Sequence, residues 1–128
     1  MNNLRSPLAK TKNLGASHDA SNAFWIQRIT ALALAALVIW FCFSVALLPE
    51  VSYPVLINWL QTPFNAVMMI LIVIIAFLHA QLGMQVIFED YISRQDARIA
   101  AIIAVKFISY FLMAYGVFSI ITIVLKGH

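Results

Sequence analysis

Three long runs of apolar residues, separated by short polar segments, make up most of the chain. The first runs from residue 26 to 48, the second from 63 to 88 and the third from 99 to 125. Each run is long enough for a helix to cross a hydrocarbon core about 30 Å thick, which takes roughly 20 residues. The pattern therefore predicts an all-α integral membrane protein with three transmembrane helices.

The segment before the first run, residues 1–23, is polar and has no periodic apolar stripe. It is predicted to be a cytoplasmic polar tail, which leaves residues 24–128 as the transmembrane anchor. The connections between the runs are too short to hold a soluble domain. Either Ser21 or Asn22 is expected to cap the first helix, because both side chains accept hydrogen bonds from free backbone N–H groups.

The first connection, residues 49–62, contains no basic residue and is predicted to be a short loop ending in the interfacial aromatic Trp59. Thr62 and Pro63 predict the start of the second helix, with threonine as the cap and proline at the first helical position. That helix is expected to continue to about Tyr91, ahead of a second, polar loop.

Composition narrows the class of protein further. The chain is 63% hydrophobic and 10% charged, with a mean hydropathy of +0.93, unlike an average soluble domain. The net charge is +3, and the basic residues lie mostly in the tail and the second loop, a pattern that orients helices in a membrane and does not indicate nucleic-acid binding. The positive-inside rule predicts that the N-terminus lies inside and the C-terminus outside.

The candidate chemistry lies around His79, the only histidine in an apolar run. An ionisable side chain at membrane depth usually marks a functional site. On a helix that advances about 100° per residue, His79, Gly83 and Asp90 fall on one stripe. His79 lies about 5 Å inward of the midpoint of its span, whereas Asp90 and Tyr91 lie roughly 17 to 18 Å further on, at the interface. Two sites at two depths are therefore predicted.

A buried neutral imidazole requires a partner, and haem iron, a hydrogen-bonding neighbour and a proton relay all stay open for His79. Gly83, one turn away, makes room either for a flat macrocycle or for ordinary helix packing. Because His18 and His128 lie outside the hydrocarbon region, a second histidine ligand would have to come from another polypeptide. Methionine ligation from within the chain is the alternative, although methionines also fill gaps between helices. The candidates are Met68, Met69, Met84 and Met113.

Asp90 and Tyr91 combine a hydrogen-bond acceptor with a phenolic donor, a pair that suits a quinone headgroup and proton exchange with water. The structural alternative is that Tyr91 belongs to the interfacial aromatic belt and that Asp90 pairs with Arg94 or Arg98. Arg28, the only full charge in the first run, either neutralises a haem propionate or supports a quinone pocket, or it is a topology charge with a snorkelling stem.

Two motifs resemble a known family. The string His79-Ala80-x-x-Gly83-Met84, followed by Asp90-Tyr91, resembles the second helix of the D-type hydrophobic membrane-anchor subunit of succinate dehydrogenase, respiratory complex II. Gly15 and the string Phe24-Trp25-x-Gln27-Arg28-x-Thr30-Ala31 resemble the lead-in to the first helix of that subunit. The layout of three spans extends the resemblance over nearly the whole chain.

The resemblance implies that His79 is an axial ligand of haem b, whose other ligand comes from a C-type cytochrome b anchor subunit. It also implies that Tyr91 binds the ubiquinone headgroup and that Asp90 supports this site. The implied partners are the C-type anchor, the iron–sulfur subunit and the flavoprotein subunit of a succinate:ubiquinone oxidoreductase, in which this chain is a non-catalytic subunit. The bacterial inner membrane is the expected location, ahead of the mitochondrial inner membrane. The alternatives are a fumarate reductase anchor and a structural anchor without a cofactor.

Overall fold

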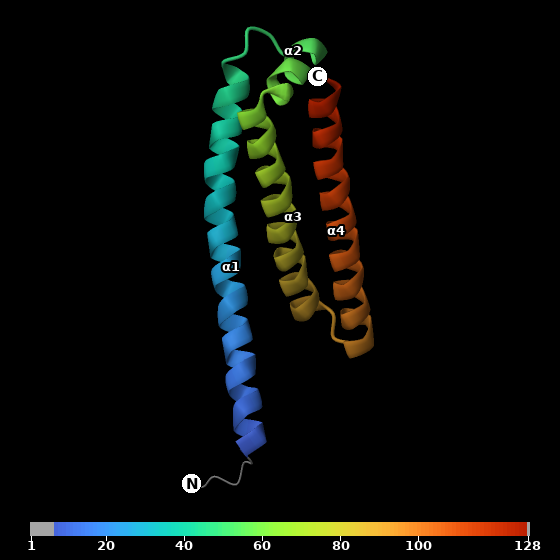
Figure 1. Cartoon of the computed structure of the whole chain (residues 1–128). Helices are drawn as coiled ribbons and strands as arrows, with labels where there is room; N and C mark the ends of the chain where they lie inside the picture. Colours follow the sequence, from blue (N-terminus) through green and yellow to red (C-terminus); the bar gives the residue numbers. More distant parts are fainter. Residues whose placement is uncertain (1–6, 128) are drawn as a thin grey trace.

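The computed structural model describes the backbone of residues 7–127 and the side chains of residues 21–127. Arg5 and His128, together with the side chains of Lys10, Lys12 and His18, lie outside this part. Within it the chain forms three long helices and one short helix (Figure 1). Their bounds are α1 Pro7–Ala46, α2 Tyr53–Gln61, α3 Pro63–Tyr91 and α4 Gln95–Lys126.

Helix α3 lies between α1 and α4 (Figure 1). Its backbone runs close to both neighbours, whereas the backbones of α1 and α4 do not approach each other closely within residues 7–127. The short helix α2 contacts α3 and α4 at the end of the bundle where the C-terminus lies. Since α3 alone has a long helix on either side, the residues on its two flanks determine how the bundle is held together.

Three segments are long and apolar enough to cross a membrane: Ser21–Ala46 of α1, Pro63–Tyr91 and Gln95–Lys126. The prediction of an all-α protein with three spans is confirmed, and the predicted extension of the second helix through Tyr91 is also correct. The third helix begins four residues earlier than the apolar run that starts at residue 99. Asp96 favours this early start, because a carboxylate in the first turn interacts well with the helix dipole. The orientation across the membrane stays a prediction.

The predicted cap of the first helix is wrong. Helix α1 begins at Pro7, so Ser21 and Asn22 lie inside it and cap nothing. The segment before them contains several Ala, Leu and Lys residues, which favour helix, and no proline after Pro7. A polar composition was therefore mistaken for a break in the helix.

The first connection is not a plain loop, since residues 53–61 form α2. Trp59 lies inside this helix, where its Nε1 donates a hydrogen bond to Ser44 Oγ of α1 at 2.8 Å. Its ring stacks on Trp40, with the ring centroids 5.7 Å apart. At the end of α2, Gln61 Nε2 donates to the carbonyl oxygen of Ile123 in α4 at 3.1 Å. These contacts with α1 and α4 stabilise a helix too short to be stable alone.

Thr62 and Pro63 do mark the start of α3, as predicted. Thr62 occupies the N-cap position, but its hydroxyl makes no capping hydrogen bond to α3. It donates instead to the carbonyl oxygen of Asn58 in the preceding helix, at 3.4 Å. The position of the helix start was therefore predicted correctly and the capping contact was not.

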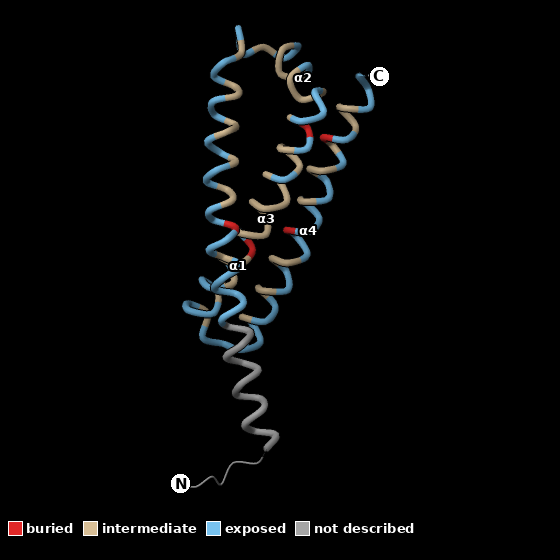
Figure 2. Tube along the Cα trace, turned by 60° about the vertical axis from the view of Figure 1, so that its left-hand side comes forward, coloured by how far each residue is buried: buried red, intermediate tan, exposed pale blue. Residues whose placement is uncertain are grey.

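Burial in the bundle is the reverse of that in a soluble protein. Three polar side chains are buried within residues 21–127, those of Thr30, Gln81 and Ser109, against only two apolar ones, those of Ala66 and Ile120 (Figure 2). Many large apolar side chains on all three long helices are exposed. Such a surface is not stable in water, but it suits lipid or the helices of a partner.

Candidate functional site

His79 is half-buried on the side of α3 that faces α1, where its Nδ1 lies 3.0 Å from Oγ1 of Thr30. The same Oγ1 lies 2.8 Å from the carbonyl oxygen of Ile26 and 3.1 Å from that of Gln27. A carbonyl oxygen only accepts, so the threonine hydroxyl is placed to donate its single proton to its own helix. With the hydroxyl in that position, Oγ1 accepts the proton of Nδ1 and the neutral ring keeps its free lone pair on Nε2, whereas a hydroxyl turned toward Nδ1 would go with the other tautomer.

The other side of this site is open. Nε2 of His79 has no hydrogen-bond partner among residues 21–127. Gly83 lies one turn along α3, and apart from the backbone of α3 no atom of the described residues lies within 4 Å of the place where its Cβ would stand. The sequence left haem iron and a hydrogen-bonding neighbour open as alternative partners of the imidazole. The geometry accommodates both, because Thr30 contacts one ring nitrogen and leaves the other available.

These residues fit an axial haem ligand. An iron-bound histidine uses one ring nitrogen for the metal and usually donates its other N–H to a nearby acceptor, and Oγ1 of Thr30 lies at hydrogen-bond distance from Nδ1 of His79. A haem brings the four nitrogen ligands of its macrocycle, so one imidazole on each face completes the iron coordination. Within residues 21–127 no three His, Cys, Asp or Glu side chains form a group that could hold a metal ion.

Asp90 and Tyr91 form the end of α3, and both are exposed, Tyr91 to 83%. The structural alternative for Asp90 was an ion pair with one of the arginines of the second loop. In the part of the chain with described side chains, Arg94 pairs with Asp96 instead, with Nη2 and Oδ2 2.7 Å apart, and Arg98 has no ion pair. The carboxylate and the phenol are therefore both accessible to a ligand or a partner.

Arg28 is not brought to His79. Arg28 precedes Thr30 by two residues, and at about 100° per residue the two side chains lie roughly 200° apart around α1. Since Thr30 faces α3, Arg28 lies on the side turned away from α3. Its guanidinium stands over the ring of Phe24, 4.8 Å from the centroid. No carboxylate pairs with it among residues 21–127. Within this chain the geometry favours an interfacial charge with an aromatic contact.

Thr30 is the residue of this site to which the sequence assigned no role. The available signal was weak: a single threonine near the start of an otherwise apolar run. Its side chain is only 9% exposed. Its importance becomes visible only when the register of α1 against α3 is known.

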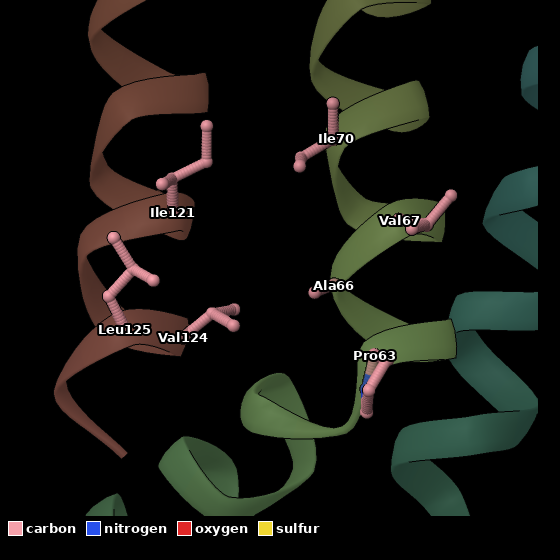
Figure 3. Close-up of a pocket in the computed structure, with 7 residues that line it drawn as sticks. All are labelled: Pro63, Ala66, Val67, Ile70, Ile121, Val124 and Leu125. Carbon is pink, nitrogen blue, oxygen red and sulfur yellow. The ribbon is translucent and has the colours of Figure 1, made fainter. Parts of the chain in front are cut away.

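A pocket of about 240 Å³ lies between α3 and α4, at the end of the bundle near α2 (Figure 3). Its lining is apolar and consists of Pro63, Ala66, Val67, Ile70, Ile121, Val124 and Leu125. The lining residue nearest to His79 along α3 is Ile70, about 14 Å away at 1.5 Å per residue. With no polar side chain in its lining, the pocket offers nothing to orient a headgroup or hold a metal, and it is not part of the histidine site.

The fold and the site define an integral membrane subunit of three spans, with one inward-facing histidine and with outer faces left for lipid and partner proteins. A family model described as the succinate dehydrogenase/fumarate reductase transmembrane subunit matches residues 2–113. The chain belongs to this family.

Similar proteins carry matching names. The chain is 36% identical over 120 residues to the succinate dehydrogenase hydrophobic membrane anchor subunit of Rickettsia bellii, a match that covers 94% of this chain and 88% of that one. It is 30% identical over 100 residues to the succinate dehydrogenase membrane anchor subunit of Reclinomonas americana, covering 76% and 83%. The anchor subunit of Paracoccus denitrificans is 28% identical over 102 residues, covering 80% and 79%. The resemblance drawn from the His79 motif is thus confirmed.

Proposed function

We propose that this chain is the D-type anchor of a succinate:ubiquinone oxidoreductase, in which His79 is one axial ligand of haem b. The observation that carries the proposal is the 3.0 Å contact of His79 Nδ1 with Oγ1 of Thr30, which uses one ring nitrogen and leaves Nε2 available to iron. The second ligand comes from a histidine of a C-type cytochrome b anchor subunit. The iron–sulfur and flavoprotein subunits bind at the end of the bundle that carries the α3–α4 loop, on the inner face of a bacterial inner membrane.

The haem supplies one-electron transfer when bound. The contribution of this chain is to hold a neutral imidazole at a fixed orientation. Thr30 holds the ring through Nδ1, and the missing side chain at Gly83 leaves space one turn away. The surrounding apolar side chains exclude water from the ring.

The quinone site uses the end of α3. Tyr91 donates a hydrogen bond from its phenol to a carbonyl oxygen of ubiquinone, and the carboxylate of Asp90 accepts protons beside it. Both side chains are exposed at the end of a span, where a quinone arriving through the bilayer meets water. Quinone reduction takes up one proton for each electron, so a position that contacts both phases suits the reaction.

The partner anchor packs against faces that this chain leaves uncovered. Ala31 and Ala35 lie one turn apart on α1, and both are exposed. Small residues at this spacing allow a second helix to approach closely in a membrane. We assign this stripe, together with the open side of Gly83, to contact with the C-type subunit or the haem.

The test of the histidine assignment is the absorption spectrum of the complex purified with His79→Ala in this chain. We expect the haem b bands to be lost or shifted, while the chain still inserts, because alanine does not make insertion costlier. His18→Ala, which removes a histidine outside the span, is the matched control and should keep the wild-type spectrum. An unchanged haem spectrum in His79→Ala would rule out the assignment.

A fumarate reductase anchor is the second candidate, because the family description names both enzymes. The two differ in the direction of electron flow. Membranes containing the assembled complex should reduce ubiquinone with succinate faster than they reduce fumarate with a low-potential quinol. The opposite ratio would replace the first candidate with the second.

A further inference from the structure

We infer that Thr30 is a positioning residue for His79: its hydroxyl selects the ring tautomer and strengthens the imidazole as a ligand. The inference rests on the proposed ligation of haem by His79. Thr30 belongs to α1 and His79 to α3, so the imidazole is held ready to bind iron only when these two helices are in contact.

The hydroxyl of Thr30 has one proton to give. The carbonyl oxygens of Ile26 and Gln27 in α1 lie 2.8 and 3.1 Å from Oγ1, within reach of that proton. When the proton points to them, the lone pairs of Oγ1 face α3. The Nδ1 atom of His79 lies 3.0 Å from Oγ1 and is then the donor.

Because Thr30 is buried, the direction of this hydrogen bond determines the tautomer of His79. Thr30 is 9% exposed, so water does not compete for its hydroxyl. In apolar surroundings a donor without an acceptor is costly, and the tautomer protonated on Nε2 would leave that N–H without an acceptor among residues 21–127. The contact therefore favours the tautomer whose Nε2 is free to bind a metal.

The same hydrogen bond tunes the ligand. An acceptor at Nδ1–H makes the ring a stronger electron donor, which would strengthen its bond to iron and favour the oxidised metal. A hydroxyl is a neutral acceptor, so the effect is smaller than that of a carboxylate. Losing an outer-shell partner of this kind typically weakens metal binding by roughly 10- to 100-fold. Removal of the hydroxyl should thus loosen the haem and move its midpoint potential in the positive direction.

A purely structural role for Thr30 is the competing explanation. Of the hydrogen bonds among residues 21–127, this is the one that joins side chains of α1 and α3. Its loss would then weaken helix packing and change nothing specific to the ring. Measurements on the assembled complex must therefore distinguish weaker assembly from weaker binding of haem by His79.

The experiment compares Thr30→Val and Thr30→Ala with Thr30→Ser in the complete complex. Valine keeps the shape and removes the hydroxyl, whereas serine restores it. Thr122→Val is the matched control, because the Thr122 hydroxyl donates to its own helix at Phe118, 2.8 Å away, and touches no histidine. The readouts are the rate of haem transfer to excess apomyoglobin and the midpoint potential, both normalised to assembled complex.

We expect both apolar variants at Thr30 to lose haem about 10-fold faster or more, with a more positive potential, and Thr30→Ser to stay near wild type. Unchanged haem loss and potential in Thr30→Val would overturn the inference, as would equal effects in Thr122→Val. If neither apolar variant assembles while Thr122→Val does, Thr30 is a packing residue and the inference also fails. The proposed function fails separately, when His79→Ala keeps a wild-type haem spectrum.

Discussion

Val73 of α3 packs directly on the backbone of Gly116 of α4. A Cβ added to Gly116 would lie 3.0 Å from Cγ1 of Val73 and 3.8 Å from its Cγ2. Valine is β-branched and has one strongly preferred χ1 rotamer in a helix, so it cannot turn away without strain. The absence of a side chain at Gly116 is therefore what allows α3 and α4 to approach so closely.

Gly116→Ala should weaken the contact between α3 and α4. Alanine gains up to about 1 kcal/mol in helix propensity, but overpacking against Val73 costs roughly 1 to 3 kcal/mol. We expect a lower thermal unfolding midpoint of the purified complex. The double variant Gly116→Ala with Val73→Ala should recover much of the loss, because the clash is removed. A single variant as stable as wild type, or a double variant with no recovery, would show that the contact is not tight.

Gly83→Ala, unlike Gly116→Ala, is not expected to overpack a neighbouring helix of this chain. Apart from the backbone of α3 itself, no atom among residues 21–127 lies within 4 Å of the new Cβ, so this part of the chain loses no contact and gains helix propensity. Any loss of haem or of assembly would then point to a group outside residues 21–127. We expect reduced haem content per assembled complex, measured by the pyridine haemochrome spectrum. If haem content and assembly both match wild type, the open side of Gly83 faces only lipid.

Arg28→Lys tests whether the arginine serves the haem. The positive charge is kept and the planar guanidinium, which stands over Phe24, is lost. Since Arg28 lies on the side of α1 turned away from Thr30, we expect the haem midpoint potential and quinone reductase activity to stay at wild-type values. A shifted potential would mean that the assembled complex brings Arg28 to a propionate.

The spans were predictable because the length of an apolar run measures directly whether a helix can cross a membrane. Thr62 and Pro63 marked the start of α3 for a local reason, the fixed backbone of proline. The helix α2 was not predictable in this way. Its stability comes from Trp59 binding Ser44 and stacking on Trp40, contacts made across the fold.

The residues of the candidate site were also predictable only where the signal is local in the sequence. His79 was identifiable because an imidazole in an apolar run is unusual in itself. Its partner was not, since Thr30 lies 49 residues away and the pairing depends on the register of two helices. The same register decides that Arg28 points away from the histidine. A sequence pattern places residues around one helix, but it does not say which neighbour stands opposite.

The assignment of Tyr91 to the quinone site leads to the sharpest functional prediction. Tyr91→Phe keeps the ring and removes one hydrogen bond, a loss of roughly 0.5 to 1.5 kcal/mol for a neutral acceptor. The loss grows if the quinone oxygen gains charge during reduction, because the phenol then stabilises the transition state more than the bound quinone. We expect a large fall in succinate-to-ubiquinone turnover. Succinate oxidation by an artificial acceptor, which needs only the soluble subunits, should be unaffected.

Asp90→Asn should act in the same direction, because the amide keeps the shape of the carboxylate but cannot accept a proton. No arginine pairs with Asp90 among residues 21–127, so the variant breaks no ion pair that would complicate the result. Tyr53→Phe, an equally exposed tyrosine at the other end of the bundle, is the matched control and should retain full activity. Both activities are measured in membranes normalised to assembled complex. If Tyr91→Phe keeps full quinone reductase activity and inhibitor sensitivity, its phenol is an interfacial anchor, and other residues must bind the quinone carbonyl.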